Sequence, residues 1–119
     1  PHVQFSLLHV WSTFYLELHT TLKQFDKRDR HGLGAHIDST ALSILDYLLL
    51  AKVKQGSARL LILDKLDREL VREKILVRLA HQIKAVKDSH YIKLEQKILE
   101  MGRMVGGWIK QEKHKKEQV

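Results

Sequence analysis

The chain has 119 residues, and its 21 Lys and Arg against 14 Asp and Glu give a formal charge of +7 with the eight histidines neutral. The absence of cysteine excludes a disulfide framework, a thiolate zinc site and a cysteine nucleophile. No apolar run reaches the ~18 residues of a membrane span, and no signal peptide is expected. One Pro and six Gly in a chain that is 44% apolar argue against disorder and against a turn-rich all-β fold.

The first predicted helix covers about residues 5–24 and has a single apolar stripe with steps of three and four residues. Three of the stripe residues are aromatic, but the segment 1–24 has no net charge, whereas aromatics that stack on bases lie among basic residues. We therefore expect the stripe to pack in a core. Its members are Leu7, Trp11, Phe14, Leu18, Leu22 and Phe25.

The second predicted helix covers residues 27–54, with Asp26 as its N-cap. It has two adjacent apolar lines, which make a face wider than one docking contact needs. Such a helix lies centrally in a bundle or at a subunit interface. From these lines we expect packing or interface roles for Ile37, Leu42, Leu45 and Leu49.

Two more helices are predicted, over 57–87 and 89–112, followed by a frayed basic tail over 112–119. Gly56 suits a helix C-terminus and Ser57 the next N-cap. In the last helix, Gly102 and Gly106 are four residues apart and would let another backbone approach closely, with Trp108 packing nearby. Four long helices with short loops predict one all-α domain over 1–119, an antiparallel up-down four-helix bundle.

The excess charge lies in the second half of the chain, with a net charge of +4 over residues 54–86 and +3 over residues 87–119. Aligned cations on a helix repel one another, and Asp64, Glu69 and Glu73 would offset this as ion pairs within the helix. A phosphate backbone would turn the same repulsion into attraction. The pattern does not separate RNA from DNA, or either from an acidic protein. The candidate binding residues are Arg59, Lys65, Arg68, Arg72, Arg78, Lys84, Lys93 and Lys97.

The spacing of potential catalytic groups does not indicate an enzyme. No two histidines are three or four residues apart, and no Glu-x-x-His, Gly-x-Ser-x-Gly or phosphate-loop motif occurs. Asp38 and Asp46 lie near one helix face, but Asp38 is expected to be a buried hydrogen-bonding group rather than half of an acid–base pair. We expect no metal ion and no cofactor.

Three stretches together resemble the accessory variability determinant proteins of diversity-generating retroelements, which belong to a four-helix-bundle superfamily with the proteins encoded in intervening sequences of large-subunit ribosomal RNA. They are Ile37-Asp-Ser-Thr-Ala-Leu-Ser-Ile-Leu-Asp46, Arg78-Leu-Ala-His81 and Gly102-Arg-Met-Val-Gly-Gly-Trp-Ile-Lys110. The resemblance covers about residues 5–111 and departs at Phe25-Asp26, where the family often has Phe-Pro.

The resemblance implies a non-enzymatic partner of a reverse transcriptase. Such proteins assemble as a pentameric barrel, bind RNA or DNA through basic surface, and support mutagenic copying of template RNA into cDNA. We expect a cytoplasmic protein of bacterial, archaeal or phage origin and, since no apolar run is long enough for a span, no membrane contact. The alternatives are a helical scaffold that docks an acidic protein without binding nucleic acid, and a metal-dependent bundle enzyme.

Overall fold

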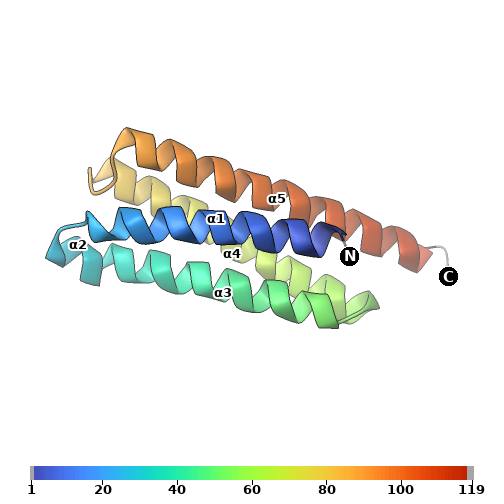
Figure 1. The fold of residues 1–119 in the computed structure, drawn as a ribbon. Coiled ribbons are helices and arrows are strands. Elements are labelled where there is room, and N and C mark those ends of the chain that lie inside the picture. Colours follow the sequence, from blue (N-terminus) through green and yellow to red (C-terminus); the bar gives the residue numbers. More distant parts are fainter. Residues whose placement is uncertain (1, 118–119) are drawn as a thin grey trace.

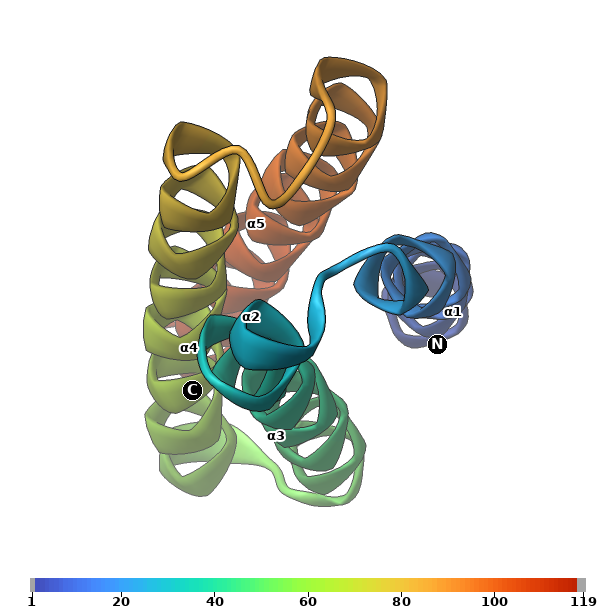
Figure 2. The same cartoon turned by 90° about the vertical axis from the view of Figure 1, so that its left-hand side faces the viewer.

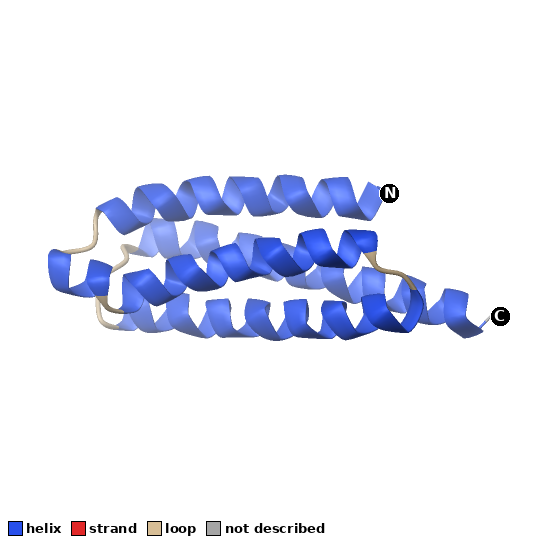
Figure 3. Ribbon diagram, turned by 90° about the horizontal axis from the view of Figure 1, so that it is seen from below, coloured by secondary structure: helices blue, strands red, loops and turns tan. Residues whose placement is uncertain are grey.

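The computed structural model describes residues 2–117, with the side chains of residues 6–115, and these form an all-α fold without strands (Figure 1). Four long helices alternate in direction and are joined by short connections (Figure 3). The all-α prediction is confirmed. The helices are α1 (His2–Lys23), α2 (Lys27–His31), α3 (Leu33–Val53), α4 (Gly56–Gln82) and α5 (Asp88–Glu117).

The four long helices occupy the corners of a bundle that measures 53 × 21 × 20 Å. Neighbouring pairs are α3 with α4, α4 with α5, α5 with α1, and α1 with α3, so α1 lies diagonally across from α4 (Figure 2). The apolar stripe of α1 enters the core as predicted, and Phe14 is fully buried. Trp11 lies beside it and donates its indole N–H to the carbonyl of Ala41 on α3 at 2.9 Å, so its one polar atom is satisfied.

The second predicted helix is divided into two. Asp26 caps α2 as expected, because its carboxylate accepts the N–H of Asp29 at 2.8 Å. The chain then leaves helical geometry at Gly32, and α3 starts at the next residue. A Cβ on Gly34 would lie 3.2 Å from the Phe25 ring and 3.0 Å from a carbonyl oxygen of α2, so glycine permits this tight crossing.

The third predicted helix begins one residue earlier and ends five residues earlier than expected. Gly56 is its first residue and has a φ of +61°, while Gln55, not Ser57, occupies the N-cap position. The C-terminus forms a Schellman motif, in which Ala85 N–H donates to Ala80 O at 2.9 Å and Lys84 N–H to His81 O at 3.0 Å. The motif therefore holds Lys84 in the left-handed region.

Lys84 has a φ of +65°, and it is the one non-glycine residue with positive φ in the described residues. The left-handed conformation costs an L-residue with a side chain about 1–2 kcal/mol, which is why glycine is the usual occupant. The prediction that Lys84 extends a helix is wrong, since it lies in the turn between α4 and α5. By contrast, α5 is longer than predicted and continues to Glu117, while the last two residues of the predicted tail lie outside the described residues.

Candidate nucleic-acid interface

The face of α4 that points away from the core carries three of the predicted cations. Lys65, Arg68 and Arg72 are exposed, and steps of three and four residues place them on one side of the helix. Arg68 pairs with Asp64 at 3.3 Å, but their side chains are 79% and 57% exposed, so this predicted ion pair contributes little. Arg72 Nε donates to Thr40 Oγ1 on α3 at 3.3 Å. These cations remain accessible to a solvent anion.

Apolar side chains are interleaved with these cations. Leu61, Val71, Ile75 and Leu79 are exposed large hydrophobics of α4. A surface hollow of about 320 Å³ on this face is lined by Arg68, Val71, Arg72, Ile75 and Leu76. The outer face of α4 is therefore both cationic and apolar, which suits contact with a protein as well as with a phosphate chain.

Arg78 lies on the side of α4 next to α5. The hydrogen bond from Tyr91 Oη to Glu95 Oε2, at 2.7 Å, raises the pKa of Tyr91 above its usual range, and the nearby Arg78 acts in the opposite direction. Arg78 is exposed but oriented toward this pair. It therefore borders the α4–α5 seam rather than joining the cations that face α3.

Lys93 and Lys97 belong to a different surface. His90 Nδ1 lies 3.1 Å from Glu17 Oε1 on α1, and the two lysines follow His90 by three and seven residues on the same helix face. Lys97 also approaches Glu100 at 3.7 Å. Because α1 and α4 are diagonal, these lysines do not join the cations of the α4 outer face. The predicted set is thus not one continuous patch.

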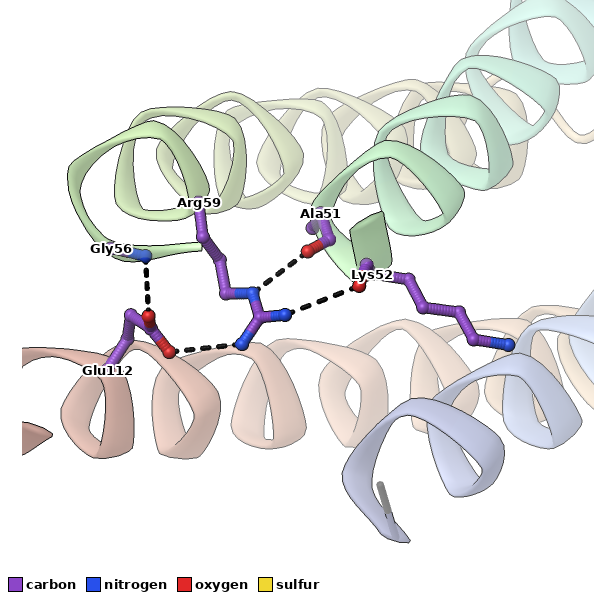
Figure 4. A network of polar contacts seen from close by, with 5 residues as sticks. All are labelled: Ala51, Lys52, Gly56, Arg59 and Glu112. Carbon is purple, nitrogen blue, oxygen red and sulfur yellow. Dashed lines mark hydrogen bonds and ion pairs between the residues drawn. The ribbon is translucent and has the colours of Figure 1, made fainter. Parts of the chain in front are cut away.

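Arg59 is a correction, because its side chain is only 11% exposed and it forms part of the interior. Its Nη1 lies 3.1 Å from Glu112 Oε2, its Nε donates to Ala51 O at 2.9 Å, and its Nη2 donates to Lys52 O at 3.3 Å (Figure 4). The guanidinium also lies over the Trp108 ring, 5.3 Å from its centroid. It satisfies carbonyls at the C-terminus of α3 instead of binding phosphate.

Glu112 completes this network from α5. Its Oε1 accepts the N–H of Gly56, the first residue of α4, at 2.8 Å. Burial raises the pKa of Glu112, but the hydrogen bonds from Gly56 and Arg59 and the positive charge of Arg59 outweigh it, so the pKa lies below its usual range. We call Arg59, Glu112, Gly56 and the carbonyls of Ala51 and Lys52 the Arg59 cluster. It ties three helices together at one end of the bundle.

The predicted packing residues divide into an inner and an outer set. Ile37 and Trp108 are buried in the core, and Leu45 packs partly against it. Leu42 and Leu49, from the second apolar line of α3, are 42% and 44% exposed. Within the described chain, α3 is therefore fully covered on one side, while Leu42 and Leu49 on the outer line stay partly open to solvent.

Gly102 and Gly106 do not lie at a close helix crossing within the described chain, because a Cβ built at either position meets nothing within 4 Å. The expected close approach occurs instead at Gly34. Gly102 lines a shallow groove of about 340 Å³ between α4 and α5. Its other lining residues are Asp67, Leu70, Val71, Lys74, Ile98, Leu99 and Arg103.

Two carboxylates of the interior behave differently. Asp38 is half-buried and accepts a hydrogen bond from Tyr15 Oη at 2.8 Å, in agreement with its predicted role in fixing helix register, and Asp46 is exposed. Glu73 is fully buried, and neither of its carboxyl oxygens has a hydrogen-bond partner. Burial raises the pKa of Glu73 to about 9, so its carboxyl group is neutral at pH 7. The prediction that Glu73 forms an ion pair with a cation of the same helix is therefore wrong.

None of the described helices is long and apolar enough to cross a bilayer. No curated protein and no solved structure matches the chain. A family profile described as bAvd-like matches residues 9–112, which includes all three stretches on which the resemblance rests. The chain therefore belongs to the bAvd-like family, that of the accessory variability determinant proteins of diversity-generating retroelements.

Proposed function

We propose that this protein is a non-enzymatic accessory factor that binds RNA or DNA through exposed cations and associates with the retroelement reverse transcriptase to support mutagenic cDNA synthesis. The observation that carries the proposal is the row of exposed cations on α4, in a chain with a net charge of +7 and membership of an accessory-protein family not known as catalytic. The polymerase would supply the chemistry, and this protein would position nucleic acid near it.

The electrostatics of α4 support this role. Lys65 makes no ion pair among the described residues, and the one carboxylate paired with Arg68 is itself largely exposed. Repulsion between aligned cations costs a few tenths of a kcal/mol per pair in the free protein. Phosphates would relieve that repulsion and release counterions, so affinity should fall steeply with salt.

Reversing two charges on this face should weaken binding of a labelled single-stranded RNA. We expect Arg68→Glu with Arg72→Glu to lower the affinity at least tenfold at low salt and to reduce the salt slope by about 1.4, or 0.7 for each lost contact. Fluorescence anisotropy titrated with KCl measures both quantities. Lys110→Glu with Lys113→Glu, which makes the same change of charge near the end of α5, is the matched control. Unchanged RNA affinity in the α4 variant at low salt would refute this binding face.

We further propose that the protein works as a homo-oligomer, with the pentamer as the expected state. Support comes from the outer apolar line of α3, where Leu42, Leu49 and Val53 are exposed. Exposed apolar residues in rows of this kind are typical of protein contacts. A ring would also multiply the positive field and give weak protomer contacts avidity.

The assembly is tested by changing the α3 line. Light scattering coupled to size exclusion should give about 70 kDa for the wild type, five times the 13.9 kDa protomer. Leu42→Glu with Leu49→Glu places two charges in the contact and should shift the mass to that of smaller species while far-UV circular dichroism stays helical. Ser39→Glu, which adds one charge at an exposed position of α3 outside the line, is the control and should leave the mass unchanged. A wild-type monomer at micromolar concentration would exclude the pentamer.

A second candidate function is a scaffold that docks an acidic protein without nucleic acid. It is favoured by the mixed outer face of α4 and by the groove between α4 and α5, where apolar residues lie between Lys74 and Arg103. The RNA titration distinguishes the two functions. Binding that is absent, or insensitive to salt, would support the protein partner, and a steep salt dependence would support nucleic acid.

A further inference from the structure

One end of the bundle collects cations from two connections that are far apart in sequence. This end is formed by α2 with the turn that precedes it and by the turn between α4 and α5, and Figure 2 looks directly at it. All six cations there are exposed. We call them the end surface: Lys23, Lys27, Arg28, Arg30, Lys84 and Lys87.

The acidic residues at this end are already engaged with the protein itself. Asp26 caps α2, Asp29 lies in the first turn of α2, and Asp88 Oδ1 lies 2.6 Å from His81 Nε2. By contrast, Lys27, Arg28, Lys84 and Lys87 lie among the residues that the structure describes and have no ion pair there. The end surface therefore has more cations than nearby carboxylates, and four of the cations have no ion pair among the described residues.

Lys84 is held at this end in a conformation that favours glycine. Its φ of +65° follows from the Schellman motif that ends α4, and the side chain is exposed. A lysine there makes the turn less stable than a glycine would, and its side chain makes no hydrogen bond or ion pair among the described residues that would compensate. Non-glycine residues held in such conformations are concentrated at functional sites.

Arg30 and Lys23 form a second part of the end surface. Arg30 Nη2 donates to Lys23 O at 3.3 Å and to Phe25 O at 3.1 Å, which fixes the guanidinium against the C-terminus of α1. A hollow of about 280 Å³ lies beside it, and three of its four lining residues carry a basic side chain. They are His19, Lys23 and Arg30, with Leu22 as the fourth. The hollow has the size and chemistry to admit a phosphate group.

We propose that the end surface binds the phosphate backbone of a nucleic acid, as a contact region separate from the outer face of α4. This inference rests on the proposed nucleic-acid function and adds a second binding region to it. Of the six end-surface residues, Lys84 alone is among the candidate binding residues predicted from the sequence. The bundle is about 20 Å across, a length over which a nucleic acid presents several phosphates. Arginine and lysine from both connections can therefore contact one strand together.

The scarcity of apolar side chains favours a nucleic acid over an acidic protein at this end. Among the described residues, Ile83 is the one exposed large hydrophobic residue at this end of the bundle. The other exposed large hydrophobic residues lie on the long helices. Protein interfaces have an apolar centre, while phosphate contacts need charge and hydrogen-bond donors. The end surface has the second composition.

The test uses substitutions that separate binding from stability. Lys84→Gly relieves the left-handed strain and removes one cation, so the thermal midpoint should rise by about 4 °C while affinity for labelled single-stranded RNA falls. Lys84→Gln with Lys87→Gln should reduce the salt slope of RNA binding by about 1.4. Lys54→Gln, at an exposed lysine of the other end of the bundle, removes one charge as Lys84→Gly does; it is the control for that single change and should leave the slope nearly unchanged.

The outcomes separate this inference from the function on which it rests. Wild-type protein that binds no RNA overturns both proposals. RNA binding that is weakened by the Arg68 and Arg72 changes, but not by those at Lys84 and Lys87, overturns the end surface alone. Poly-L-glutamate is the second probe, and loss of its binding with unchanged RNA binding would assign the end surface to an acidic protein.

Discussion

Replacing Glu73 with methionine should raise the free energy of unfolding at pH 7 by about 3 kcal/mol. The Glu73 side chain is completely buried, and neither carboxyl oxygen has a hydrogen-bond partner. Burial, together with the carboxylates of Glu69 and Asp38, raises its pKa to about 9, and Arg72 offsets this only in part. Methionine fills a similar volume without a polar group, so the core loses an unsatisfied acid and keeps its packing.

The pH dependence of stability follows from the same shift. An unfolded chain releases the Glu73 proton near pH 4.5, whereas the folded protein holds it until about pH 9, so the native state binds one more proton between these values. The free energy of unfolding should therefore fall by about 1.4 kcal/mol per pH unit across that window, on account of this residue. Below pH 4.5 Glu73 imposes no ionisation penalty. The Glu73→Met variant lacks this slope at every pH.

Urea unfolding at pH 5.5, 7 and 8.5, at one fixed protein concentration, measures the difference in free energy of unfolding between Glu73→Met and wild type. The gap between Glu73→Met and wild type should widen as the pH rises. Glu73→Gln should remove the pH-dependent part but gain less stability, because a buried amide still lacks partners. Glu69→Gln, a change at a partly exposed neighbour, should change stability little. Parallel pH profiles for wild type and Glu73→Met would contradict a neutral, buried Glu73.

The helices could be predicted from the sequence because apolar spacing follows the helical period, and the α1 stripe with Trp11 and Phe14 entered the core as expected. The ends were less predictable. Gly32 breaks the second predicted helix, and a Schellman motif ends α4 before Lys84. Lysine gives no sequence signal for the left-handed conformation, so only the hydrogen bonds of the turn reveal it.

The candidate site is harder to predict, because a charged residue in a helix is expected at the surface unless its buried partner is known. Arg59 and Glu73 lie on the same seam as Leu66 and Leu70, with steps of three to seven residues between successive members. That spacing was the available signal for burial. The partner of Arg59 was not readable, since Glu112 is 53 residues away in the chain and reaches it only through the packing of α5 on α4.

Replacing Arg59 with methionine should lower the free energy of unfolding at pH 7 by about 3–4 kcal/mol. The substitution leaves the Glu112 carboxylate, 6% exposed, hydrogen-bonded to the Gly56 N–H but without its charged partner. It also removes two hydrogen bonds to the carboxyl end of α3. An unpaired buried charge is more costly than the pair is stabilising. Accordingly, Arg59→Met with Glu112→Met should recover about 2 kcal/mol of the loss, and a double-mutant cycle measures that coupling.

The matched control is the surface pair of the same helix. Arg68 and Asp64 lie 3.3 Å apart, close to the 3.1 Å of Arg59 and Glu112, but they are largely exposed, so Arg68→Met should cost less than about 0.5 kcal/mol.

The pH dependence of the loss in Arg59→Met adds a second criterion. The folded-state pKa of Glu112 lies below 4.5, so its stabilising contribution is present above that value and is lost as the pH falls through the folded pKa. The loss in Arg59→Met should therefore be largest at neutral pH and should shrink as the pH falls and the Glu112 carboxyl becomes protonated. Equal losses for Arg59→Met and Arg68→Met would mean that distance alone, and not burial, sets the strength of these pairs.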